Sequence, residues 1–375
     1  MRFIITSDWE LTTSRLPKAR EILEELGVQI PADTIIIHDG DAFREYNEET
    51  INFVRQFFYG REAWYIVGNH DRGVNLDRLS ALFNTPSDKP VYSEPKIRPL
   101  GSGRFAAFLP APNRAAFGAT RGAEGKRARD AALSQALEAA LISLETQIGP
   151  ENLGRAVLFA HAATDGEELG LGQLASGLTW TIPGARLQRW GRVFLGHVHK
   201  PGQIAENVWS VGGIANWTFA DKAEQFRALT LDTETFEVGE IPLKRVLVPI
   251  EMDMNCIGIT ERLSDSFSWT ISALDGIDKA IIPALKDRGV DLGTDTVSLK
   301  IRARLPQNEM ALVPSADELR DAINALVERP LIQNCIITRE VTGLHKARLT
   351  SEQSAREMTL EQMLELYIET TKATD

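Results

Sequence analysis

The chain has 375 residues, of which 43% are hydrophobic and 25% are charged, and its formal net charge is −11 at pH 7. This length is too great for one small core and predicts two domains, and no apolar run approaches the ~20 residues that a membrane-spanning helix needs. The acidic balance argues against a chain coated in nucleic acid, although a local basic groove would let an acidic body act on DNA.

Two further features favour a cytoplasmic protein. Residues 1–8 form a short apolar strand that runs into a carboxylate, whereas a secretory signal needs a longer apolar region. The two cysteines, Cys256 and Cys335, cannot build a disulfide framework, and both lie in strand-like runs. We expect them to be reduced and buried.

Three apolar strands in the first part of the chain each end in polar side chains. The strands are predicted at 2–6, 32–37 and 63–67, with helices at 17–26 and 48–58 between them. The polar residues that follow the strands are Asp8-Trp9-Glu10, His38-Asp39-Gly40-Asp41 and Gly68-Asn69-His70-Asp71. Alternating strands and helices predict an α/β sheet, in which ligands bind beyond the carboxyl ends of the strands. A lone Asp after a strand is usually a turn residue, but three successive strands that end this way predict a metal site.

The middle of the chain adds a long helix and more strands that end in histidine. The helix is predicted at 124–148, and the strand at 156–160 leads into His161. The strand at 192–195 leads into Gly196-His197-Val198-His199, and strands at 208–213 and 226–231 are predicted to close a second sheet. Basic residues gather around the start of the helix; they are Arg114, Arg121, Lys126, Arg127 and Arg129. They form either a solvated helix start or a patch that contacts a phosphate backbone.

The ligand types collected in this order are carboxylate, amide oxygen and imidazole. The set comprises Asp8, Glu10, Asp41, Asn69, His70, His161, His197 and His199. Such a mixture suits manganese, iron or zinc better than magnesium or calcium. The set exceeds the needs of one ion and suits two ions about 3.5–4 Å apart, bridged by one carboxylate, which clamp a phosphoryl group.

These motifs resemble those of the calcineurin-like metallophosphoesterase superfamily, which carries Asp-x-His, Gly-Asp, Gly-Asn-His-Asp or Glu, His and Gly-His-x-His in this order. The chain is similar at every element except the first, where Glu10 stands in place of the histidine. The resemblance implies an α/β fold, a two-sheet β-sandwich flanked by helices, and a hydrolase with two divalent ions, most favourably Mn(II).

The resemblance also implies a role for each residue. The residues implied to bind the first metal are Asp8 and His199, Asp41 is implied to bridge both ions, and the second metal is implied to have Asn69, His161 and His197 as ligands. His70 is implied to act as an acid or transition-state stabiliser, oriented by Asp71. Glu10 either joins the first metal site as a carboxylate ligand or marks a site with weakened chemistry.

Three segments further resemble the SbcD-type DNA repair nuclease, phage versions of which are similarly short. The segments are 187–199, 209–213 and 219–221. The resemblance covers most of the chain and loosens beyond about residue 245. It implies a DNA exonuclease or endonuclease in double-strand-break repair or recombination, a homodimer, and a coiled-coil ATPase of the SbcC type as partner. We expect the nuclease domain at 1–242.

The remaining sequence predicts a smaller α/β capping domain that contacts DNA, at 243–345. Its strands are expected at 246–252, 296–303 and 331–341, with helices at 277–286 and 316–327, and Ser315 with Glu318 forms a capping-box start. Residues 346–375 are expected to form a linker and a C-terminal helix. Its apolar stripe, made by Leu360, Met363, Leu364 and Tyr367, either packs on its own domain or docks on the ATPase.

Two alternatives to a nuclease remain at this point. A small-molecule phosphatase or a cyclic-nucleotide phosphodiesterase would use the same metal site, but such enzymes rarely need a second α/β domain. A non-catalytic scaffold would have a site disabled by Glu10 and would anchor the ATPase to DNA ends.

Overall fold

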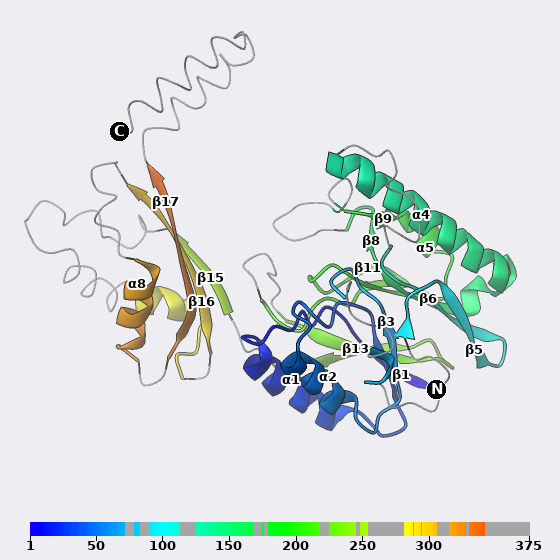
Figure 1. Ribbon diagram of the computed structural model, residues 1–375, viewed down its shortest axis with the longest axis horizontal. Coiled ribbons are helices and arrows are strands. Elements are labelled where there is room, and N and C mark those ends of the chain that lie inside the picture. Colours follow the sequence, from blue (N-terminus) through cyan, green and yellow to red (C-terminus); the bar gives the residue numbers. More distant parts are fainter. Residues whose placement is uncertain are drawn as a thin grey trace, which may run out of the picture. The chain divides into compact units, whose positions relative to one another are not determined.

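The computed structural model describes residues 1–71, 79–82, 91–112, 125–167, 175, 179–217, 225–244, 248–253, 281–287, 289–293, 295–305, 315–327 and 330–341. The chain divides into two compact units, Met1–Leu247 and Val248–Asp375 (Figure 1). No helix in the described part is long and apolar enough to cross a membrane.

The first sheet of the larger unit has six strands in the order β14-β13-β1-β2-β3-β4. Its strands are β1 (Arg2–Thr6), β2 (Ile35–His38), β3 (Ala63–Ile66), β4 (Val91–Tyr92), β13 (Arg227–Asp232) and β14 (Val238–Pro242). β1 to β4 run parallel, and Thr6 lies opposite His38 in the register. The carboxyl ends of these parallel strands therefore open onto one edge.

The second sheet also has six strands, in the order β11-β12-β10-β7-β6-β5. Its strands are β5 (Lys96–Gly101), β6 (Arg104–Leu109), β7 (Ala156–His161), β10 (Arg192–Gly196), β11 (Gly202–Ala205) and β12 (Val208–Ser210). The four central strands are parallel, and Gly196 pairs with His161. The two histidine-bearing segments thus leave the sheet side by side.

The two sheets pack face to face with helices on their outer faces. Phe3, Ile5 and Ile37 of the first sheet share a buried cluster with Phe159 and Phe194 of the second. On the outer face of the first sheet lie α1 (Leu16–Gln29) and α2 (Glu48–Phe58), and α4 (Gly125–Ile148) covers the second, as Figure 1 shows. The predicted α/β architecture, two sheets flanked by helices, is confirmed.

The side chains of β1 alternate between two buried clusters, one on each face of the first sheet. Phe3 and Ile5 point between the sheets, while Ile4 packs among the residues of α1 and α2. Alternate side chains of a strand point to opposite faces, so a strand that is buried on both sides reads as a continuous apolar run. The helix α2 begins where the Asn47 side chain accepts hydrogen bonds from the N–H groups of Glu49 and Thr50.

Short elements connect the second sheet to its surroundings. They are η1 (Pro150–Arg155), β8 (Ala163–Thr164), β9 (Thr181–Ile182) and α5 (Gly184–Leu187). β8 and β9 pair as a small two-stranded ribbon, which carries the chain from His161 back toward β10.

The smaller unit contains a three-stranded parallel sheet in the order β15-β16-β17. Its elements are β15 (Val248–Asp253), α7 (Ile282–Asp287), β16 (Val297–Leu305), α8 (Ala316–Asn324) and β17 (Ile332–Val341). Leu285 of α7 and Leu319 of α8 pack with Leu299 of β16 in one core. The predicted capping box is confirmed, because Ser315 and Glu318 cap each other's backbone at the start of α8.

Two sequence-based expectations need correction. β13 was expected in the second sheet, but it pairs antiparallel with β1 in the first. Without β13 and β14 beyond it, β1 would be an edge strand with unpaired backbone groups beside the site. Cys335 is free as predicted but only partly buried, and burial raises the pKa of its thiol to about 11.

Some expectations lie outside the described residues. They concern Cys256, Arg114, Arg121, the side chains of Lys126 and Arg127, and the C-terminal segment 346–375.

Candidate metal centre

The loops after five parallel strands meet at one edge of the two sheets. The loops after β1 and β2 are tied together because the Asp8 N–H donates to the Gly40 carbonyl at 3.0 Å and the Glu10 N–H donates to the Asp41 carbonyl at 2.9 Å. The second sheet joins them where the His197 N–H donates to Asp8 Oδ2 at 2.9 Å. The structure therefore brings the strand-end residues into one cluster.

Asp41 and His161 form the centre of this cluster. His161 Nε2 lies 3.1 Å from Asp41 Oδ2 and 3.2 Å from Asn69 Oδ1. The other ring nitrogen, Nδ1, lies 2.7 Å from the Asp39 carbonyl oxygen, to which it donates. Because a histidine that binds metal usually donates its other nitrogen in this way, Nε2 is the atom presented to an ion.

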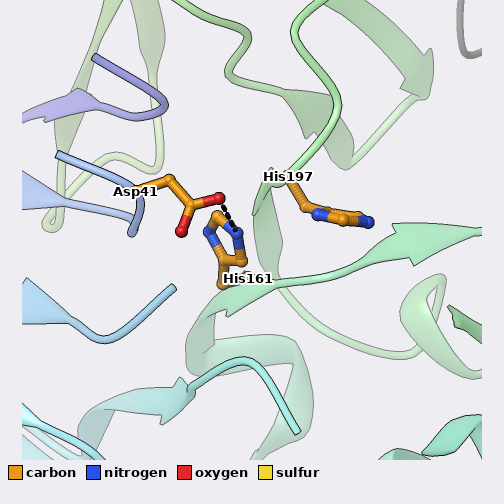
Figure 2. A group of neighbouring side chains, drawn as sticks. All are labelled: Asp41, His161 and His197. Carbon is orange, nitrogen blue, oxygen red and sulfur yellow. Dashed lines mark hydrogen bonds and ion pairs between the residues drawn. The ribbon is translucent and has the colours of Figure 1, made fainter. Parts of the chain in front are cut away.

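His197 stands beside this pair (Figure 2), and one atom from each of Asp41, His161 and His197 lies within 4.8 Å of the others. Its Nε2 lies 2.9 Å from Thr179 Oγ1, and its ring stacks on Trp180 with centroids 4.6 Å apart. The contact with Thr179 leaves Nδ1 for a metal. Thr179 and Trp180 precede β9 and carried no signal in the sequence.

A second group surrounds Glu10. Ligand atoms of Glu10, Asp41 and His70 all lie within 4.8 Å of one another. His199 Nε2 is 3.8 Å from both Asp8 Oδ1 and Glu10 Oε1. The residues predicted for the first metal are thus gathered on the side of Asp41 that faces Glu10.

Both oxygens of Glu10 are held by arginines that belong to none of the sequence motifs. Arg15 Nη1 donates to Oε2 at 3.2 Å, and Arg44 Nη1 donates to Oε1 at 3.1 Å. Glu10 itself is buried, with its side chain 3% exposed. Neither arginine is part of a strand-end motif, so their contacts with Glu10 could be found only from the three-dimensional structure.

The predicted contact between Asp71 and the His70 ring is not seen among the described residues. The Asp71 carboxylate instead accepts hydrogen bonds from the N–H groups of Asp41 at 2.9 Å and Gly68 at 2.8 Å. Asp71 is linked to His70 indirectly, through Asp41, whose Oδ1 accepts the His70 N–H at 2.7 Å. Buried backbone donors need partners, and Asp71 satisfies them in the turn that carries Asp41.

The donor set fits divalent metal ions. Asp8 Oδ1 is buried and has no hydrogen-bond partner among the described residues. Asp8, Glu10, Asp41 and His197 all have positive φ, at 49°, 46°, 56° and 85°. Such backbone conformations are costly for residues other than glycine and gather at functional sites. An unsatisfied carboxylate oxygen beside imidazole nitrogens is what an ion would satisfy.

The pKa shifts of the buried histidines and carboxylates also favour a cation at this place. Burial alone would lower the pKa of His161, but the neighbouring carboxylates of Asp41 and Asp8 raise it to about 10. Burial would raise the pKa of Asp41, yet His161 and His70 hold it well below its usual range. Burial, reinforced by His161, lowers the pKa of His197 to about 3. The metal-free chain therefore carries a proton on His161 where a cation would otherwise lie.

The metal-free protein is expected to lose stability as the pH rises. The pKa of His161 in the folded chain, about 10, lies above the ordinary value of 6.5, so its contribution is complete below pH 6.5 and is lost progressively toward pH 10. The loss reaches up to about 1.4 kcal/mol per pH unit. Urea unfolding in the presence of a chelator at several pH values measures it. His161→Gln is the comparison, and an equal slope in both proteins would contradict the assignment.

Replacing Thr179 is expected to weaken metal binding without removing a ligand. Thr179→Val leaves His197 Nε2 without its partner, so the ring is no longer held with Nδ1 toward Asp41. Loss of such a supporting contact typically costs about 10–100-fold in metal affinity. Manganese titration calorimetry measures the change, and Thr179→Ser, which keeps the hydroxyl, should restore affinity. A valine variant that binds manganese as tightly as the wild type would refute this role.

Comparisons with known proteins identify no close relative. No protein-family model matches the chain, and no curated protein matches it. Among similar solved structures, an archaeal phosphodiesterase has a TM-score of 0.31 at 13% identity, over 65% of this chain and 100% of its own. A Haemophilus influenzae NAD nucleotidase has a TM-score of 0.31 at 12% identity, over 64% of this chain and 49% of its own. An Aquifex aeolicus protein of unknown function has a TM-score of 0.25 at 12% identity, over 43% of this chain and 79% of its own. Similarities this low indicate nothing about substrate or chemistry, for which the residues of the site are the guide.

Proposed function

We propose that the chain is a metal-dependent phosphoesterase. The observation that supports this most is the convergence of carboxylate, amide and imidazole groups on Asp41 and His161 from the ends of both sheets. Mixed ligands around one shared carboxylate suit a pair of divalent ions of the manganese class. This agrees with the order of motifs that resembles the metallophosphoesterase superfamily.

In this proposal, different residues of the chain bind the metal ions and donate the proton. The residues that would hold the ions are Asp8, Asp41, Asn69, His161, His197 and His199. Divalent ions held there supply a clamp for phosphoryl oxygens and a nucleophilic water of lowered pKa. To His70, whose side chain is 36% exposed, the proposal assigns the transfer of a proton to the leaving oxygen.

Within this class we propose a DNA exonuclease or endonuclease of the SbcD type. Support comes from the resemblance of residues 187–199 and from the second α/β unit, whose β15, β16 and β17 form a sheet of their own. In this proposal the second unit contacts DNA, the chain forms a homodimer, and segment 346–375 binds a coiled-coil ATPase of the SbcC type.

Substrate preference tests the proposal. Purified protein with manganese would be offered linear duplex DNA, bis(p-nitrophenyl) phosphate, p-nitrophenyl phosphate and a cyclic nucleotide, each with a chelator control. Cleavage of duplex DNA that stops on chelation, and that an SbcC-type ATPase with ATP modulates, is the expected result. Preference for a monoester or a cyclic nucleotide would remove the nuclease assignment and leave the phosphoesterase.

A scaffold without catalysis is the second candidate, and the two arginines on Glu10 favour it. Glu10 stands where the family carries a histidine, and its oxygens are engaged by Arg15 and Arg44. A scaffold predicts no manganese-dependent cleavage in the wild type and a gain of cleavage in Glu10→His. If the same substitution lowers an existing activity, Glu10 is a working part of an enzyme.

A further inference from the structure

Glu10 lies at the centre of a cluster with two arginines, Arg15 and Arg44. The segments that carry Glu10 and Arg44 are joined by backbone hydrogen bonds, because the Leu11 N–H donates to the Ala42 carbonyl at 2.9 Å and the Arg44 N–H donates to the Leu11 carbonyl at 3.0 Å. Arg15 adds a second contact, from Nη1 to the Glu10 carbonyl at 2.7 Å. Backbone pairing therefore holds the Glu10 and Arg44 segments together, and side-chain hydrogen bonds join Arg15 to Glu10.

The two arginines differ in what remains available to a ligand. The Arg15 side chain is 19% exposed and lies over the Trp217 ring at 5.3 Å, so it is packed inside the loop. The Arg44 side chain is 49% exposed. Among the described residues, every hydrogen bond of its guanidinium is made by Nη1. Its Nε and Nη2 donors can therefore bind another group.

Arg44 also contacts His70, which belongs to one of the two candidate ligand groups. Its Nη1 is 3.0 Å from His70 Nε2, and the His70 N–H is bound by Asp41. One arginine balances the charge of Glu10, so the cluster of one carboxylate and two guanidinium groups has a net charge of about +1. Guanidinium groups bind phosphate oxygens through paired, charge-assisted hydrogen bonds.

We propose that Arg44, held in place by Glu10, binds a non-bridging oxygen of the substrate phosphate. The proposal rests on the phosphoesterase function proposed above and assigns Glu10 to orienting an arginine, with Arg15 balancing its charge. It accounts for a buried carboxylate at the position of the family's histidine. Arg44 is thus a substrate-binding residue, and Glu10 is a positioning residue.

Phosphate binding to the manganese-loaded protein tests the proposal. Titration calorimetry with inorganic phosphate would be compared for the wild type, Arg44→Gln and Arg20→Gln. Arg20 is a matched control, because it is also an exposed arginine, with its side chain 46% exposed, and it pairs with a glutamate on α1. Loss of a charge-assisted contact predicts phosphate affinity about tenfold or more weaker in Arg44→Gln. Arg20→Gln should bind phosphate as the wild type does.

Two further readouts separate substrate binding from damage to the metal centre. Metal content per chain should be the same in Arg44→Gln and Glu10→Gln as in the wild type. KM for bis(p-nitrophenyl) phosphate should rise more than kcat falls in Arg44→Gln. Glu10→Gln should weaken phosphate binding by a smaller factor, because the amide oxygen still accepts a hydrogen bond from Arg44.

The possible outcomes keep this proposal apart from the proposed function. Unchanged phosphate affinity in Arg44→Gln, or no phosphate binding by the wild type, overturns the role of Arg44 even when the wild type hydrolyses phosphodiesters. Loss of metal in Glu10→Gln assigns Glu10 to the metal and overturns its role as holder of Arg44. Arg44-dependent phosphate binding without any hydrolysis supports Arg44 and removes the enzymatic function.

Discussion

Asp41→Asn is expected to reduce manganese-dependent phosphodiester hydrolysis by at least about a thousandfold, which corresponds to several kcal/mol of transition-state stabilisation. Asp41 is the carboxylate shared by both candidate ligand groups. An amide in its place keeps the shape but removes the charge that faces His161, and it would not bridge two cations. Hydrolysis of bis(p-nitrophenyl) phosphate and metal content per chain measure the two effects.

The same substitution should also destabilise the metal-free fold. Asp41 and His161 are both buried, with side chains 1% and 0% exposed. Removal of one member of a buried ion pair costs about 3–5 kcal/mol. Asp33→Asn is the control, since Asp33 is an exposed carboxylate just before the same strand, β2. An Asp41→Asn protein with normal metal content and rate would show that Asp41 is no ligand.

Most of the fold and the cluster itself could be predicted because their signals are local. Apolar runs such as 2–6 and 156–160 are strands in the structure, and Asp8, Asp41 and Asn69 each lie within three positions of the end of a strand. Parallel strands in one sheet place their carboxyl ends at one edge, so sequence order alone predicts that Asp8, Asp41 and Asn69 meet. His161 adds a strand from the other sheet, which only the complete pattern of motifs predicts.

The contacts that tune the site could not be predicted, because they join segments with no shared pattern. Arg44 reaches Glu10 across 34 positions in the sequence, and Thr179 reaches His197 across 18. An arginine in a loop is ordinary in composition, and its role depends on where the backbone places it. The prediction that β13 belongs to the second sheet was wrong for the same reason, because strand propensity does not specify which strand will be the pairing partner.

The second large effect is expected at Gly40, between Asp39 and Asp41. Gly40 has φ of +90°, and a Cβ at this position would overlap the His161 ring. The ring has little room to yield, because Nδ1 is bound by Asp39 and Nε2 by Asp41. Gly40→Ala therefore combines backbone strain of about 1–3 kcal/mol with overpacking of about 1–3 kcal/mol. A loss of unfolding free energy of roughly 2–6 kcal/mol is expected, together with loss of bound manganese.

Gly60→Ala separates the two contributions. Gly60 has a similar φ of +73°, but an added Cβ would meet nothing within 4 Å. Its alanine variant should lose only the strain energy and keep wild-type metal content. The difference between the variants in urea-derived unfolding free energy then measures the clash with His161, about 1–3 kcal/mol. Equal losses in both, with metal retained in Gly40→Ala, would mean that the His161 ring can move aside and that its position does not depend on the glycine.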